Sequence, residues 1–86
     1  MAQAHSASPA TEADVQAELY RLTASGEARR IREESGLTLA IVARSIGADR
    51  AQVSRWEKGQ RRPTGRAALD YLHLLHRLAK AGGPNN

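Results

Sequence analysis

Basic side chains gather in one stretch of this sequence, where their type and spacing favour contact with a polyanion. Residues 44–66 carry seven Lys and Arg against the two carboxylates Asp49 and Glu57, whereas residues 1–28 carry one Arg against four carboxylates. An Arg guanidinium is planar and can donate two parallel hydrogen bonds to a phosphate or to the edge of a guanine. A cationic block beside an acidic remainder therefore indicates a polyanion-binding face, with an ordinary solvated helix surface as the alternative.

Other kinds of chemistry find no support in the residue types. The chain has no Cys, which excludes disulfides, thiolate metal sites and cysteine nucleophiles. His73 and His76 stand three residues apart without a convergent acid, so we expect no metal and no cofactor. No serine stands in a nucleophile elbow, and we expect no enzymatic activity. Without an apolar stretch of roughly 18 residues or a signal peptide, we expect a cytoplasmic, nucleoid-associated protein with no membrane partner.

The elements that must position the basic block are helices. Ala, Leu, Arg and Glu are frequent and favour helix, while aromatic residues make up 3% of the chain. Apolar spacing, caps and Gly stops predict helices over residues 11–25, 27–35, 39–45, 50–58 and 65–81. The pattern leaves open whether Gly26 separates the first two. We expect an all-α fold in one domain over residues 11–81, with disordered tails at 1–10 and 82–86.

The last predicted helix is more apolar than one core contact requires. Its main stripe comprises Ala68, Tyr71, Leu72, Leu75 and Ala79, and the stripe is widened by Ala67, Leu74 and Leu78. The excess predicts contact either with the first helix, through Val15, Leu19 and Leu22, or with a second subunit. Leu74 and Leu78 are therefore candidate dimer-interface residues.

Residues 39–58 meet the requirements of a helix-turn-helix, in which two short helices are joined through a Gly turn. Ala43 is small enough for the second helix to cross over it, and Gly47 allows the left-handed backbone of the turn. The wedge between the helices would be filled by Val42, Ile46, Val53 and Trp56. The helical phase of Trp56 with Val53 predicts a core position for its ring.

Short segments in and around this motif complete a wider pattern over about residues 28–78. They are Ile31-Arg-Glu-Glu-Ser-Gly-Leu-Thr38, Val42-Ala43, Ile46-Gly47, Val53-Ser-Arg-Trp-Glu-Lys-Gly59 and Arg62-Pro63. In these segments the chain resembles the Cro/C1-type (XRE) family of helix-turn-helix regulators, including the small phage-type repressors. The resemblance implies a compact, lambda-repressor-like bundle of four or five helices that binds double-stranded DNA in the major groove.

The resemblance also implies which residues contact DNA. Base contacts are expected on the helix over residues 50–58, from Arg50, Ala51 and Arg55, with Gln52 and Ser54 on its flanks. Phosphate contacts are expected from Thr38, Arg44, Lys58, Arg61, Arg62 and Arg66. The family usually has Gln where this chain has Leu39, which cannot donate that phosphate bond. The free N–H groups of that helix end, with Thr38, would have to hold the phosphate instead.

Glu57 needs a partner, because a carboxylate beside a polyanion is unfavourable. The resemblance implies a structural ion pair between Glu57 and Arg32. A local pair with Arg61, four residues further on, is the alternative, and such pairs are worth only roughly 0.3–0.5 kcal/mol.

Together these features predict a sequence-specific transcriptional regulator, a repressor of phage or mobile-element type. It would act on a double-stranded DNA operator as a homodimer, with half-sites about 34 Å apart. One alternative is an antitoxin that regulates its own gene through the same motif and masks a toxin partner with the acidic helix over residues 11–25. Another is a protein-interaction adaptor that does not touch DNA.

Overall fold

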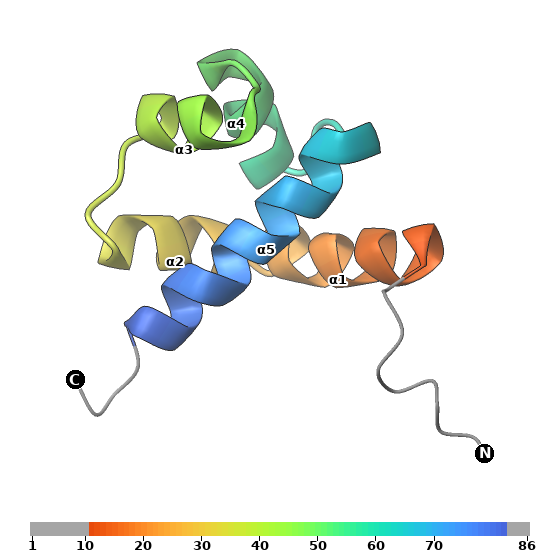
Figure 1. The fold of residues 1–86 in the computed structure, drawn as a ribbon, viewed down its shortest axis with the longest axis horizontal. Coiled ribbons are helices and arrows are strands. Elements are labelled where there is room, and N and C mark those ends of the chain that lie inside the picture. The colour runs from red at the N-terminus through yellow and green to blue at the C-terminus, as the bar shows by residue number, and fades with distance from the viewer. Residues whose placement is uncertain (1–10, 83–86) are drawn as a thin grey trace.

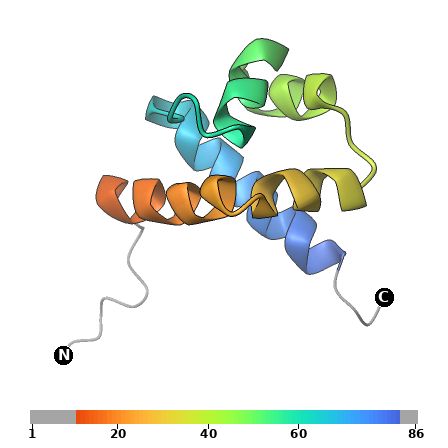
Figure 2. The same cartoon turned by 180° about the vertical axis from the view of Figure 1, so that it is seen from behind.

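Helices make up all the regular structure of residues 11–82, which are the residues that the computed structural model describes (Figures 1 and 2). In chain order they are α1 (Glu12–Ala24), α2 (Glu27–Glu34), α3 (Leu39–Ile46), α4 (Arg50–Glu57) and α5 (Gly65–Ala81). In Figure 1, α1 and α2 run along one side and α3 and α4 form a pair on the other, while α5 crosses in front of α1 and α2 with its first turns near α4. The all-α fold class predicted from the sequence is confirmed. The two predicted tails lie outside the described residues, apart from Gly82.

Helix ends follow the local signals of the sequence closely. Thr11, Thr38 and Asp49 are the N-caps of α1, α3 and α4, and each side chain accepts a hydrogen bond from the backbone N–H three residues on. Gly26 has a left-handed φ of 83° and separates α1 from α2, which decides the question that the sequence left open. The ends of α1, α2, α3 and α4 differ from the prediction by one residue each, which is ordinary for helix termini.

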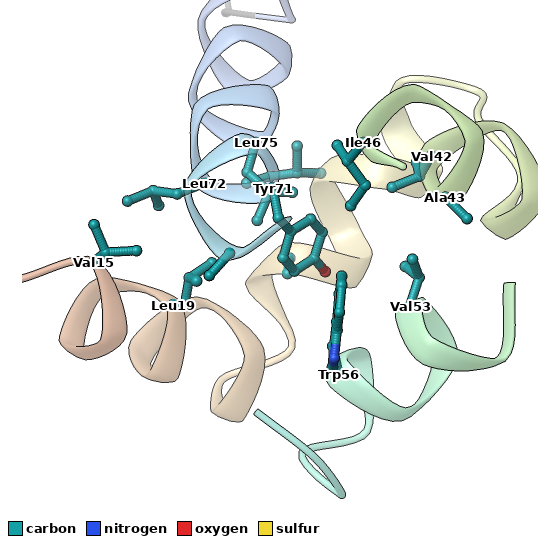
Figure 3. Close-up of a cluster of buried hydrophobic side chains, with 13 residues drawn as sticks. Val15, Leu19, Val42, Ala43, Ile46, Val53, Trp56, Tyr71, Leu72 and Leu75 are labelled. Carbon is teal, nitrogen blue, oxygen red and sulfur yellow. The ribbon is translucent and has the colours of Figure 1, made fainter. Parts of the chain in front are cut away.

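The core forms around α5. Tyr71 and Leu75 of α5 are almost completely buried, and side chains from α1, α3 and α4 converge on Tyr71 (Figure 3). The rings of Trp56 and Tyr71 have centroids 5.1 Å apart, a tilted arrangement that is worth about 0.5–1.5 kcal/mol beyond the area buried. The predicted core position of Trp56 is therefore confirmed.

Contact with α1 accounts for part of the apolar excess of α5. Val15 and Leu19 of α1 are buried in the shared core, and α1 and α5 pack directly against each other. Leu74 and Leu78 are half-buried and also pack against this core. The sequence left open whether the wide apolar stripe of α5 contacts α1 or a second subunit, and the contact with α1 is present.

Tyr71 carries the one buried side-chain polar atom without a hydrogen-bond partner in residues 11–82, its Oη. Burial raises the pKa of Tyr71 well above its ordinary value. The charge of Glu57 adds to this increase, and that of Arg32 opposes it. The fold therefore accommodates the neutral phenol and disfavours the phenolate.

Tyr71→Phe is expected to leave the free energy of unfolding at pH 7 unchanged or to raise it by about 1 kcal/mol, because it removes an unpaired buried hydroxyl. Above about pH 10 the unfolded chain releases the phenolic proton while the folded chain keeps it, so wild-type stability falls as pH rises. Relative to wild type, the variant should gain about 1.4 kcal/mol between pH 7 and pH 11. Guanidinium unfolding of both proteins measures this difference, and an equal difference at the two pH values would contradict it.

Candidate nucleic-acid interface

The α3 and α4 helices pack directly on each other and form a helix-turn-helix. Their contact buries Val42, Ala43, Ile46, Val53 and Trp56 (Figure 3). Gly47 ends α3 with a left-handed φ of 73°, a conformation that strains any residue with a Cβ. The next residue, Ala48, donates its N–H to the carbonyl of Ala43 at 2.9 Å, which closes the turn. These are the positions at which the sequence predicted the motif.

One face of α4 is buried and the other is open. Val53 and Trp56 face the core and are 0% and 4% exposed. Arg50, Ala51, Gln52 and Arg55 are exposed, whereas Ser54 is only half-exposed. Four of the five residues predicted to contact bases are therefore accessible along this helix, and Ser54 is less so.

The start of α4 is stabilised by a reciprocal pair of hydrogen bonds. Asp49 Oδ1 accepts the N–H of Gln52 at 2.8 Å, and Gln52 Oε1 accepts the N–H of Asp49 at 3.0 Å. This capping box holds the amide of Gln52 in place and leaves its NH₂ group free to donate to an acceptor. The prediction from the sequence placed Gln52 on the flank of this helix and missed its capping role, which the Asp-x-x-Gln spacing could have indicated.

In the part of the chain that the structure describes, basic residues before Thr38 are paired with carboxylates, whereas most of those that follow it are not. Among residues 11–82, each cation before Thr38 lies within ion-pair distance of a Glu, namely Arg21, Arg29, Arg30 and Arg32. No described carboxylate lies within that distance of Arg44, Arg50, Arg55, Lys58, Arg61 or Arg62, all of which are exposed. Arg66 differs from these, because its Nε lies 3.1 Å from Asp70 Oδ1. The unpaired cations leave a field that attracts anions.

A hollow lies between α4, the α4–α5 loop (residues 58–64) and the start of α5. It has a volume of about 290 Å³ and is lined by Gln52, Arg55, Trp56, Arg61, Arg62, Thr64 and Ala67. Thr64 makes no side-chain cap bond, so the first N–H groups of α5 are open to an acceptor. Guanidinium groups beside a helix N-terminus provide the donors and the positive field that a phosphate group requires.

The start of α3 offers a second, smaller set of hydrogen-bond donors. Thr38 Oγ1 accepts the N–H of Ile41 at 3.1 Å, so its hydroxyl serves as the cap while its O–H can still donate. Leu39 is half-buried against the core, and its side chain offers no hydrogen-bond donor. Phosphate contact at this end would therefore depend on Thr38 and the first N–H groups of α3.

A largely buried ion pair joins α2 to the end of α4. Arg32 Nε and Nη2 donate to the two carboxylate oxygens of Glu57 at 2.6 and 3.0 Å, and Arg32 Nη1 donates to the carbonyl of Leu37 at 2.9 Å. The two side chains are 12% and 6% exposed. Hydrogen bonding to Glu57 raises the pKa of Arg32 above its already high value. The expected Arg32–Glu57 pair is present. Within the described residues 11–82, Glu57 makes no ion pair with Arg61.

Two of the three carboxylates of α1 are engaged within the molecule. Asp14 completes a capping box with Thr11, and Glu18 pairs with Arg21 and lies 3.5 Å from His76 Nε2. The acidic surface that an antitoxin would need is thereby reduced.

Over residues 11–82, no three His, Asp or Glu side chains gather as metal ligands. No helix in the same range is both long enough and apolar enough to cross a membrane.

One protein-family model, described as a helix-turn-helix domain, matches residues 24–80. The match includes α2, α3, α4 and nearly all of α5, whereas α1 lies outside it except for its last residue. No curated protein matches the chain, and no solved structure matches it. A helix-turn-helix domain indicates DNA binding and transcriptional regulation, and it is typical of regulators that are not enzymes.

Arg32→Ala is expected to lower the free energy of unfolding by about 3–5 kcal/mol, because it leaves the Glu57 carboxylate buried without its partner. Arg61→Ala, which removes an exposed cation without an ion pair, should change it by less than about 0.5 kcal/mol. Denaturant unfolding of the two variants measures the contrast.

Replacing both members of the pair by apolar residues, Arg32→Met with Glu57→Leu, provides the control. Such exchanges often cost little, so the double variant should recover much of the loss. Equal small losses in Arg32→Ala and Arg61→Ala would show that the pair does not hold α2 to α4.

Proposed function

The chain belongs to the helix-turn-helix domain family, and we propose that it is a sequence-specific, double-stranded DNA-binding repressor of the Cro/C1 (XRE) type found in phages and mobile elements. The observation that carries the proposal is the two-sided character of α4. Its inner face is fixed in the core, while its outer face and the following loop carry exposed cations without described ion pairs. A helix of these dimensions fits the major groove of B-form DNA.

Base recognition is assigned to the outer face of α4. Arg50 and Arg55 would read guanine, because a guanidinium can donate to O6 and N7 together, and each such contact discriminates by roughly 1–3 kcal/mol. Arg55 Nη1 lies 3.4 Å from the carbonyl of Ala51, so this side chain follows the helix towards its N-terminus, where bases would be met. The methyl group of Ala51 suits the methyl group of thymine.

Phosphate contacts are assigned to the residues around α4. The hollow beside the α4–α5 loop supports roles for Arg61 and Arg62, and Lys58 stands at the end of α4. Thr38 and Arg44 would anchor the α3 side. Arg66 would have to leave Asp70 to contact DNA, but an exposed pair of this kind costs little to break.

Repression would follow from occupancy, because a protein bound across a promoter excludes the polymerase. A single copy of this domain has few residues that can contact bases, so we propose that two copies bind half-sites about one helical turn apart. Such a protein acts at the nucleoid, in the cytoplasm.

Selection of bound duplexes from a random pool tests base readout. Arg50→Ala should relax the preference at one base position and weaken binding to the selected site by about 1–3 kcal/mol. Arg61→Ala, assigned to phosphate, should weaken binding to all sequences alike. A uniform loss from Arg50→Ala would make Arg50 a backbone contact instead.

Salt dependence of the same binding separates a DNA-binding protein from an adaptor. Six neutralised phosphates predict a slope of log K against log salt of roughly −5. The absence of duplex binding at low salt would contradict the proposed function.

Sedimentation with synthetic duplexes tests the assembly. A duplex with two selected half-sites one helical turn apart should take up two copies, and at a lower protein concentration than a duplex with one half-site. Binding of a single copy to the two-site duplex at every concentration would show that the protein acts as a monomer.

A further inference from the structure

The α1 helix lies outside the matched helix-turn-helix domain, but one of its faces contacts the α4–α5 loop. Gln16 Nε2 donates to the carbonyl of Pro63 at 2.8 Å in a partly buried hydrogen bond. One turn further along α1, the ring of Tyr20 lies under the guanidinium of Arg62, with the guanidinium carbon 5.9 Å from the ring centre. Residues four apart share a helix face, so both contacts act on the loop from the same side.

Backbone hydrogen bonds within the α4–α5 loop hold only its first half in place. Gly59, with a φ of 73°, donates its N–H to the carbonyl of Trp56 at 3.1 Å, and Gln60 donates to that of Arg55 at 2.9 Å. This Schellman arrangement ends α4. Within residues 11–82, the N–H groups of the next two residues, 61 and 62, make no backbone hydrogen bond. Residues 61–63 are therefore held by the burial of Pro63 and by the contacts with α1.

Tyr20 is unusual among the large apolar side chains because it is 60% exposed. Contact with Arg62 gives this ring a role, since a guanidinium over an aromatic face is attracted to it. Arg62 makes no side-chain hydrogen bond to any residue that the structure describes, so its donors remain available to a phosphate.

Two surface hollows meet at the loop arginines. A groove of about 360 Å³ between α1 and the loop is lined by Tyr20, Arg61 and Arg62, and the same two arginines line the hollow beside α4. A loop without support from α1 could turn these side chains towards either hollow. Fixing the loop before DNA arrives lowers the entropy lost on binding.

We propose that Gln16 and Tyr20 form a clamp by which α1 positions Arg61 and Arg62 for DNA phosphates. Both are positioning residues, because they act through the loop and are assigned no contact with DNA. The proposal rests on the proposed function for its effect on DNA binding, but the ordering of the loop is a property of the free protein.

The test compares wild type with a double variant, Gln16→Met with Tyr20→Leu, and with Tyr20→Phe. Methionine and leucine favour helix, and the buried Val15 and Leu19 are untouched, so the double variant should keep its helical signal and stay folded, with a Tm only a few degrees below that of wild type. In the free protein, ¹⁵N relaxation should show the amide order parameters of residues 61 and 62 falling below about 0.6. Tyr20→Phe keeps the ring and should match wild type.

DNA binding gives the second readout. The double variant should bind the selected duplex about five- to tenfold more weakly, with a salt slope less steep by about one and an unchanged base preference. In a background of Arg61→Ala with Arg62→Ala, the same changes should have no further effect on affinity.

Unchanged order parameters in the double variant would overturn the clamp, as would an equal loss of affinity in the background that lacks both arginines. If wild type binds no duplex, the proposed function fails, but the order parameters still decide whether α1 holds the loop.

Discussion

The buried pair between Arg32 and Glu57 is the constraint on which the placement of the exposed basic face of α4 depends. It ties α2 to the last residue of α4, at 2.6 Å and 3.0 Å, close to where Trp56 enters the core beside Tyr71. A short helix of eight residues has little stability of its own, so its orientation must come from such contacts. With the inner face of α4 held in this way, its outer face has only solvent or a ligand to meet.

Charge is divided within the domain in the way that this surface requires. Glutamates of α1 and α2 neutralise the cations beside them, and Glu57 is turned inward to Arg32. Between Arg44 and Arg62 the acids are either buried, as Glu57 is, or engaged as a helix cap, as Asp49 is. The repulsion that a free carboxylate would exert on DNA phosphates is thereby removed without lowering the number of basic groups.

Local signals in the sequence predicted most of the fold, because α1, α3 and α4 each start at a polar cap and α2, α3 and α4 are each followed within two residues by a Gly with positive φ. The pair between Arg32 and Glu57 came from the family resemblance, since residues 25 apart leave no local signature. The contact of Gln16 with Pro63 spans 47 residues and depends on how α1 packs, so no local pattern could predict it. The sequence could not decide whether Gly26 separates α1 from α2, because a Gly within a helical pattern is compatible with either a break or a continuous helix.

Mapping the DNA-bound face by NMR tests whether the exposed cations of α4 form the DNA-binding surface. Amide shifts of the ¹⁵N-labelled protein would be followed while a duplex is added at low salt. The largest changes should fall on residues 50–55 and 58–66 and on the first turn of α3, with small changes on the face of α5 that packs against α1. Changes concentrated on α1 and α5, with α4 unaffected, would show that the exposed cations of α4 do not form the DNA surface.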